Sequence, residues 1–254
     1  LGVNEPVTVL LRDDFSDGNY TAASGTSGMT WTVLSGGASV SGGRLAINRT
    51  NSLIVCDQRI STNEFTIQFD AENTWSEPSR FIFLYRDSSN YYWMGLGNTT
   101  GVYRVMAGIQ EQLYADSGSK LRLPHVSPNN TNSFKIYVHN TGSAINLKFD
   151  RGGDGVDYDV ELTDTNSAAA DLFQNTGIGG ADFSSGSGSW FKLDNILVQK
   201  GLIADSRSGT IYYVDAATGD DTRTAEQATN PAAPWKTIQR AVNSAYSTDT
   251  VLVM

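Results

Sequence analysis

Between residues 7 and 200 the chain alternates apolar and polar residues in short runs, and these runs are separated by Gly, Asn, Asp and Ser. Alternation with a period of two is typical of β-strands that bury one face. These runs predict strands at residues 7–15, 43–48, 52–58, 65–72, 80–87, 90–97, 101–108, 133–140, 144–150, 158–164 and 190–200. Helical periodicity is nearly absent, and only SAAADLFQ (167–174) indicates a turn of helix. The pattern predicts an all-β fold, an antiparallel β-sandwich or jelly roll.

The pattern changes near the C-terminal end of the chain. IYYVDAATGDD (211–221) predicts a strand that runs into a turn, and DTVLVM (249–254) predicts an apolar strand. Between them, PWKTIQRAVNSAY (234–246) predicts an amphipathic helix. The apolar face of this helix would carry Trp235, Ile238, Val242 and Ala245.

This change of pattern divides the chain into two domains. At 254 residues the chain is long enough for one large β domain or two ordinary ones. GLIADSRSGT lies between the two patterns and reads as a linker. We therefore expect a β-sandwich over 1–200, a linker over 201–210 and a strand–helix–strand unit over 211–254.

Charge and composition exclude several classes of protein. The net charge of −9 and the pI near 4.6 disfavour nucleic acids and anionic membranes as partners, because a phosphate binder needs a basic face. No apolar run approaches the roughly 20 residues of a membrane-spanning helix. Charged residues make up only 18%, while Ser, Thr, Asn and Gly are abundant, which is typical of a secreted β-protein.

Cysteine and histidine give no catalytic or zinc pattern. Cys56 is the only cysteine, so it cannot form an internal disulfide, and its apolar surroundings predict a buried thiol. The two histidines, His125 and His139, show no zinc spacing and no pairing with a nucleophile.

The second unit carries a specific string of motifs. YYVD and GDD are followed by Pro-Trp-x-Thr-Ile-x-x-Ala-Val and then by DTVLV. This string resembles the entry segment of pectate-lyase-like right-handed parallel β-helix proteins, in which it caps the N-terminal end of the solenoid. The matching residues are Tyr213, Val214, Asp215, Gly219, Asp220, Pro234, Trp235, Thr237, Ile238, Ala241, Val242 and Asp249 to Val253. Because a solenoid needs about three repeats, the resemblance implies that the chain is a fragment of a longer protein.

Three phrases in the first domain carry a second resemblance. They are DDFSDG (13–18), FLYRDSSNYYWMGL (83–96) and WFKLDNILV (190–198). Together they resemble concanavalin A/laminin-G-like jelly rolls of the type that is appended to polysaccharide-degrading enzymes. This fold hosts enzymes, sugar-binding modules and spacers, so the function has to be argued from a site.

The central hairpin predicts a binding surface. If Ser88-Ser89 and Thr99-Thr100 are two-residue loops, Phe83 and Met94 share the core face. The opposite face would then carry four sugar-binding candidates, Trp93, Tyr91, Arg86 and Arg104. Trp75, in the loop before this hairpin, could form a side wall of the same binding surface. Aromatic rings stack on sugars and arginine forks onto hydroxyls, carboxylates or sulfates, so the partner would be a polysaccharide, and the arginines favour an anionic one. The alternative is that a loop or the second domain covers this face, and a register slip of one residue would exchange the two faces.

A calcium site is the second candidate. The first and last strands of such sandwiches commonly pair, which would bring DDFSDG beside KLDNILV, and a bulge at Asp194-Asn195 would re-aim side chains there. Asp14, Asp17 and Asp194 would form a hard oxygen site suited to structural Ca²⁺. The alternative is that these are solvated turn aspartates.

A catalytic pair is the weakest candidate. DYDVE (157–161) resembles the E-x-D-x-E strand of laminarinase-type glycoside hydrolases, with Asp157 and Glu161 as the outer carboxylates. Asp157 is one methylene shorter than the family's Glu, and a retaining pair must lie about 5 Å apart. Ordinary strand alternation explains the same residues.

We therefore expect a monomeric, non-catalytic carbohydrate-binding module of a secreted bacterial protein. It would hold a β-helix polysaccharide lyase or hydrolase on its substrate and raise the enzyme's effective concentration there. The alternatives are a surface adhesin or structural spacer, and a jelly-roll hydrolase that uses Asp157 and Glu161.

Overall fold

The computed structural model describes residues 8–21, 29–48, 51–73, 78–97, 100–117, 120–121, 123, 131–152, 158–183, 189–201, 211–242 and 250–254. The chain divides into two compact units, Leu1–Ile203 and Ala204–Met254.

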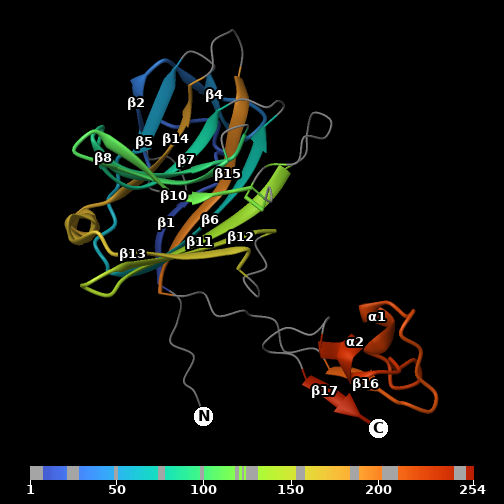
Figure 1. Cartoon of the computed structure of the whole chain (residues 1–254). Helices are drawn as coiled ribbons and strands as arrows, with labels where there is room; N and C mark the ends of the chain where they lie inside the picture. The colour runs from blue at the N-terminus through green and yellow to red at the C-terminus, as the bar shows by residue number, and fades with distance from the viewer. Residues whose placement is uncertain are drawn as a thin grey trace. The chain divides into compact units, whose positions relative to one another are not determined.

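The first unit is a sandwich of two antiparallel sheets (Figure 1). The strands of the eight-stranded sheet are β1 (Val9–Asp13), β3 (Ala38–Val40), β4 (Leu45–Asn48), β6 (Glu64–Asn73), β11 (Thr131–Asn140), β12 (Ile145–Arg151), β13 (Val160–Asp164) and β15 (Ser189–Lys200). Their order is β13-β12-β11-β6-β15-β4-β3, and β1 pairs with β15.

The second sheet of the sandwich has seven strands. They are β2 (Trp31–Ser35), β5 (Ser52–Cys56), β7 (Ser79–Asp87), β8 (Asn90–Gly95), β9 (Gly101–Met106), β10 (Ile109–Ala115) and β14 (Gly177–Asp182). Their order is β10-β9-β8-β7-β14-β5-β2. A 3₁₀-helix, η1 (Ser167–Gln174), lies between β13 and β14 along the chain, where the sequence indicated a turn of helix. The predicted all-β antiparallel sandwich is confirmed.

The core of the sandwich follows from the alternation in the strands. In β6, Phe65, Ile67 and Phe69 are buried in the core, whereas Gln68 on the other face is partly exposed. The ring of Phe69 stacks on that of Phe81 from the facing sheet, with centroids 3.7 Å apart. Burying a side chain of this size contributes about 1.5–3 kcal/mol. Repeated contacts of this kind hold the two sheets together.

Strand β14 is the clearest element that the pattern missed. Its sequence is GIGGAD, and it lies between β5 and β7 in the middle of its sheet. A Cβ at Gly179 would lie 2.4 Å from the carbonyl oxygen of Ile54, and one at Gly180 would lie 2.5 Å from a methyl group of Ile47. Glycine is therefore required here because neighbouring atoms fill the space of a side chain. The sequence pattern also missed β2, β3 and β10.

A bulge in β7 changes the predicted register of the central hairpin. Asp87 pairs with Asn90 as predicted, but Phe83 pairs with Tyr92 and not with Met94. The register shifts between Phe83 and Asp87, where Leu84 has a φ of 49°, in the left-handed region. A bulge places two successive residues on one face, so Leu84 joins Phe83 in the core and Tyr85 turns to the outer face.

Cys56 lies at the end of β5 and is fully buried, as the sequence predicts. Burial raises the pKa of its thiol from 9.0 to about 12. Because the thiolate is the reactive form, we expect no labelling by a thiol reagent at pH 8 in the folded protein and complete labelling in urea. Rapid labelling of the folded chain would show that this end of β5 opens.

The second unit is built around two parallel strands, β16 (Ile211–Val214) and β17 (Thr250–Val253). The segment between them contains α1 (Ala225–Ala228) and α2 (Ile238–Val242). Among the described residues, its core consists of Tyr212, Val214, Ala228, Trp235 and Ala241. Within the described ranges, the chain has no helix with the length and apolar character needed to cross a membrane.

The helix of the second unit begins later than predicted, and the predicted apolar face is wrong at Trp235 and Ile238, while Ala245 lies outside the described residues. Trp235 precedes the helix and pairs as an isolated bridge with Val214. Asp221 accepts hydrogen bonds from the backbone N–H groups of Lys236 and Thr237, at 2.8 and 3.0 Å, so the helix begins only at Ile238. Ile238 is consequently 53% exposed, whereas Ala241 is buried.

Candidate functional site

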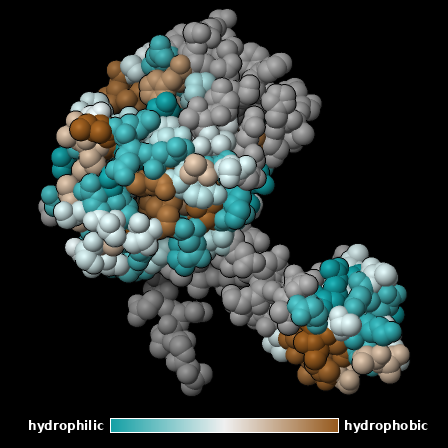
Figure 2. All heavy atoms as spheres, viewed as in Figure 1, coloured by the Kyte–Doolittle hydropathy of each residue, from teal (hydrophilic) through white to brown (hydrophobic). Residues whose placement is uncertain are grey.

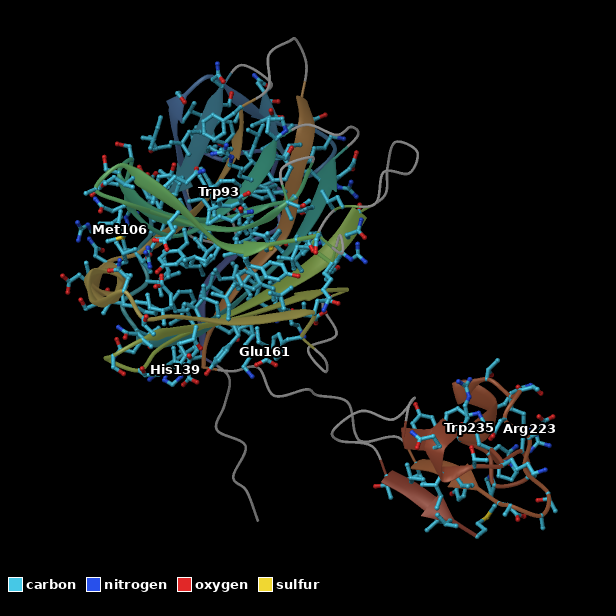
Figure 3. All side chains as sticks on the ribbon, in the orientation of Figure 1. Trp93, Met106, His139, Glu161, Arg223 and Trp235 are labelled. Atoms are coloured by element: carbon cyan, nitrogen blue, oxygen red, sulfur yellow. The ribbon has the colours of Figure 1, made fainter. Side chains whose placement is uncertain are left out.

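Aromatic side chains gather on the outer face of the seven-stranded sheet, away from the core. This outer aromatic cluster consists of Leu53, Val55, Ile82, Tyr85, Tyr91, Trp93, Tyr103, Val105, Ala181 and Phe183. Two of the residues predicted for sugar binding, Tyr91 and Trp93, belong to it. Figure 3 labels Trp93 in the first unit. Tyr91 is half-buried, but Trp93 is fully buried.

Neighbouring side chains cover both ring faces of Trp93. The ring of Tyr103 stacks on it in parallel, with centroids 3.9 Å apart, and the guanidinium of Arg80 lies 4.0 Å from its centre. Two groups this close to one ring centre must occupy opposite faces of the ring. Trp93 therefore offers no free face to a sugar in this arrangement.

Arg104 does not share this surface, so the predicted grouping is wrong. Gly95 pairs with Gly101, so five residues along the sequence, and not two, separate the last paired position of β8 from the first of β9. This odd shift in register turns Arg104 to the inner face beside Tyr92. There Arg104 forms ion pairs with the buried Asp164 and with Glu111.

The remaining predicted sugar contacts lie elsewhere. Arg86 is exposed at the tip of β7, and its Nε lies 3.4 Å from the carboxylate of Asp87. Trp75 lies outside the described residues. Arg80 was not among the predicted sugar contacts. It lies in the predicted strand 80–87, two residues before Ile82, so its side chain is on the same face as that of Ile82.

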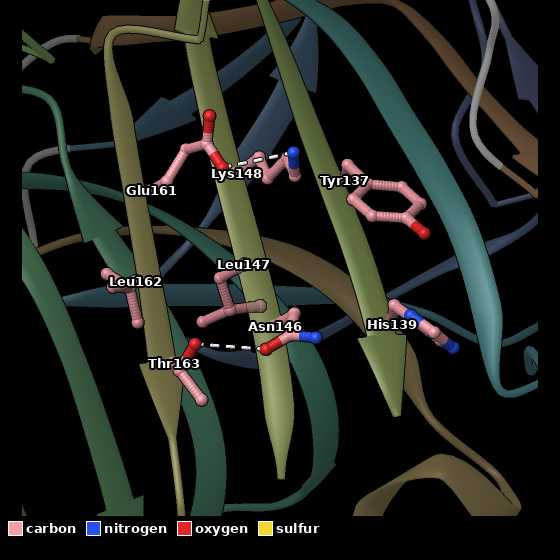
Figure 4. A pocket seen from close by; sticks show the side chains of 8 residues that line it. All are labelled: Tyr137, His139, Asn146, Leu147, Lys148, Glu161, Leu162 and Thr163. Carbon is pink, nitrogen blue, oxygen red and sulfur yellow. Dashed lines mark hydrogen bonds and ion pairs between the residues drawn. The ribbon is translucent and has the colours of Figure 1, made fainter. Parts of the chain in front are cut away.

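A groove lies on the outer face of the other sheet, over β11, β12 and β13 (Figure 4). Its volume is about 450 Å³. Two rows of side chains cross the three strands in register. The groove is lined by Tyr137, His139, Asn146, Leu147, Lys148, Glu161, Leu162 and Thr163.

The polar groups of the groove are paired across the strands. Lys148 forms an ion pair with Glu161 at 3.0 Å, and the hydroxyl of Thr163 donates to the amide oxygen of Asn146 at 3.0 Å. Burial, followed by the hydrogen bond that its hydroxyl donates to Glu64, raises the pKa of Tyr137. The groove is therefore polar with balanced charge, and it presents donors and acceptors side by side.

The candidate catalytic strand contributes to this groove. Glu161 is exposed on β13 and paired with Lys148, while Val160 is buried, which is ordinary strand alternation. The side chain of Asp159 accepts a 2.8 Å hydrogen bond from the backbone N–H of Arg151. Asp157 lies outside the described residues, so the described residues contain only one member of the predicted pair.

The predicted calcium ligands lie on paired strands. β1 pairs with β15, and the register of β15 shifts between Asp194 and Leu197, so both the pairing and the bulge are confirmed. Asp14 accepts from Ser16 and Asp17 from the backbone N–H of Asn19, as turn aspartates do. Among the described residues, no group of three or more His, Cys, Asp or Glu is arranged to hold a metal. Calcium binding at Asp14, Asp17 and Asp194 stays a prediction.

Comparison with known proteins identifies the fold. No protein-family model matches the sequence, and no curated protein matches it significantly. The structure is similar to the CBM2 module of the evolved Dit of Lactobacillus casei BL23 phage J-1, with a TM-score of 0.50 and 15% identity over 80% of this chain and 99% of that module. The first unit shares the jelly-roll β-sandwich fold.

Two further structures show the same likeness. Domain 4 of AbnA, a GH43 extracellular arabinanase from Geobacillus stearothermophilus, has a TM-score of 0.50 and 12% identity over 80% of this chain and 97% of that domain. β-Agarase A from Zobellia galactanivorans has a TM-score of 0.52 and 12% identity over 78% of this chain and 94% of that protein. At these identities the likeness concerns the fold alone.

Proposed function

We propose that the first unit is a non-catalytic carbohydrate-binding module, and that the groove over β11, β12 and β13 binds sugar residues of an extracellular polysaccharide. The groove itself carries the proposal. Its volume of about 450 Å³ falls within the range of roughly 300–1,000 Å³ that is typical of ligand sites.

The side chains of the groove suit neutral sugar hydroxyls. A hydroxyl group both donates and accepts, and the Lys148–Glu161 pair offers a charged donor and a charged acceptor 3.0 Å apart. Because the two charges balance, the groove has no preference for an ionic ligand. The solved structure of AbnA domain 4 contains arabinotriose, so a fold of this kind accommodates an oligosaccharide in another protein.

The setting that we propose is a secreted bacterial protein, in which the second unit begins a parallel β-helix enzyme. The parallel pairing of β16 and β17 supports this, because parallel strands are usually buried on both faces. Figure 2 shows an apolar patch over β17, where Leu252 and Val253 are 46% and 56% exposed. Sequencing of the gene beyond the codon for Met254 tests this part: repeating coils are expected, and an unrelated domain would contradict it.

Affinity electrophoresis against a panel of neutral polysaccharides tests the binding site. We expect Lys148→Ala to weaken binding about tenfold or more, because a hydrogen bond to a charged group contributes about 1.5–3 kcal/mol. Asn146→Ala removes a neutral hydrogen bond worth about 0.5–1.5 kcal/mol, so it should weaken binding about two- to tenfold. Gln68→Ala, on the outer face of β6 in the same sheet, is the matched control and should bind as the wild type does.

Three results would contradict the proposal. Unchanged binding in both groove variants would place the site elsewhere. Failure of the wild type to bind any polysaccharide would favour the adhesin or spacer. Sugar release by the wild type, abolished in Glu161→Gln, would favour the hydrolase.

A further inference from the structure

Arg80 lies in a stack of aromatic rings on the outer face of the seven-stranded sheet. It lies on β7, opposite Gly95 of β8. Its guanidinium is 4.0 Å from the ring centre of Trp93 and 4.4 Å from that of Phe183. Since Trp93 stacks in turn on Tyr103, the groups follow one another as Phe183, Arg80, Trp93 and Tyr103.

No carboxylate among the described residues forms an ion pair with Arg80. Other arginines of this unit have such partners: Arg44 pairs with Glu72, and Arg104 pairs with Asp164. Within the same described ranges, the Nε of Arg80 and the indole nitrogen of the fully buried Trp93 are inaccessible to solvent and have no hydrogen-bond acceptor. Two donors without acceptors therefore lie in one cluster.

Burial of this cation is unfavourable without a counter-charge. Desolvation lowers the pKa of Arg80, while the nearby Tyr91 and Tyr103 raise it by a smaller amount. The faces of Trp93 and Phe183 attract a cation, but an aromatic ring carries no net charge that could neutralise it. An oxyanion that reached the guanidinium would provide the missing counter-charge.

We propose that Arg80 binds the carboxylate of an acidic sugar residue on the outer face of the seven-stranded sheet. This site is separate from the groove, although it rests on the proposed function that the first unit binds polysaccharide. The planar guanidinium matches the two oxygens of a carboxylate. The half-buried rings of Tyr103 and Phe183, at the ends of the stack, give the apolar surface that a sugar ring covers.

Because the chain is acidic overall, binding of a polyanion would have to depend on a local cationic site. With a net charge of −9 the protein repels a polyanion as a whole. Binding to a polyuronate would therefore require a particular cation. Because Arg80 is half-buried and its Nε is inaccessible, a ligand would meet the terminal nitrogens of the guanidinium.

Titration calorimetry with polygalacturonate and alginate, together with methyl-esterified polygalacturonate, tests the proposal on the whole chain. We expect the wild type to bind a polyuronate, and Arg80→Gln to weaken that binding about tenfold or more through loss of a charge-assisted bidentate contact. Arg80→Lys should also bind more weakly, because an ammonium group cannot make the planar, bidentate contact of a guanidinium with a carboxylate. The methyl ester should bind weakly to the wild type and no differently to Arg80→Gln.

Arg86→Gln is the matched control. It removes the same charge from the exposed tip of the same strand, where Arg86 already pairs with Asp87, and polyuronate affinity should stay within about twofold of the wild type. Glu77, the nearest carboxylate to Arg80 along the sequence, supplies a second control. Glu77→Gln should leave the affinity unchanged, and a large increase would show that the chain itself neutralises Arg80, which would overturn the proposal.

Two other results would also overturn it. Arg80→Gln could bind polyuronate as the wild type does, or the wild type could bind the methyl ester as tightly as polygalacturonate, which would exclude recognition of the carboxylate. The groove variants separate this failure from that of the proposed function. If a neutral polysaccharide binds and depends on Lys148 while no polyuronate binds, only the Arg80 site fails; if no polysaccharide binds, both fail.

Discussion

Replacement of Asp164 by alanine is expected to destabilise the first unit by about 3–5 kcal/mol, because it leaves a buried cation without its main partner. The side chains of Asp164 and Arg104 are 4% and 7% exposed, and they pair at the edge where β13 meets the facing sheet. Tyr92 donates its hydroxyl hydrogen to the same carboxylate. The remaining partner of Arg104, Glu111, is 60% exposed and compensates little. Urea unfolding at pH 7 measures the loss.

A double-mutant cycle separates the ion pair from simple loss of packing. The cycle combines Asp164→Ala and Arg104→Met with the double variant Arg104→Met/Asp164→Ala. Because the double variant carries neither charge, it should be more stable than Asp164→Ala alone. Tyr92→Phe removes only one hydrogen bond to the carboxylate, with an expected cost of about 1.5–3 kcal/mol. A loss below 1 kcal/mol in Asp164→Ala, with additive effects in the cycle, would contradict the account.

The fold could be predicted from the sequence wherever apolar residues recur at every second position, on one face of a strand. Phe83 and Met94 were correctly assigned to the core because strand alternation depends only on local spacing. Strand β14 was missed because glycine has a low β-propensity. Its glycines are required by the approach of Ile54 and Ile47, which are distant in sequence, and no local pattern carries that information.

The candidate site was less predictable because it depends on register. One bulge at Leu84 and one loop that is longer than expected decided which side chains share a face. A shift by an odd number of residues exchanges the faces, so Arg104 was assigned to the wrong one. The groove was missed because its rows join β11, β12 and β13 through pairings that alternation alone does not reveal. Strand alternation places Arg80 on the same face as Ile82, as the structure does. Its aromatic neighbour Phe183, however, directly follows β14 and is distant from Arg80 in the sequence, so no local pattern brings the two together.

Replacement of Trp235 by alanine is expected to unfold the second unit and leave the first one intact. Trp235 is fully buried, stacks on Tyr212 at 5.1 Å, and donates its indole N–H to the carbonyl oxygen of Arg223 at 2.8 Å. Truncation of a buried tryptophan costs about 3–5 kcal/mol. A unit of about fifty residues has only roughly 2.5–7.5 kcal/mol of stability at 0.05–0.15 kcal/mol per residue, so this one change removes much or all of it.

Limited trypsin digestion measures this effect, because Arg223, Lys236 and Arg240 supply cleavage sites within the second unit. A loss of 3 kcal/mol raises the open population by about 150-fold, and cleavage should accelerate accordingly when opening is faster than cutting. Ile238→Ala is the matched control: its side chain is 53% exposed, so cleavage should be nearly as slow as in the wild type. Equally fast cleavage of all three proteins would mean that the Trp235 core does not hold this unit together. If only Trp235→Ala is cut, the parallel pair β16–β17 owes its stability to that core, because a two-stranded sheet is marginal by itself.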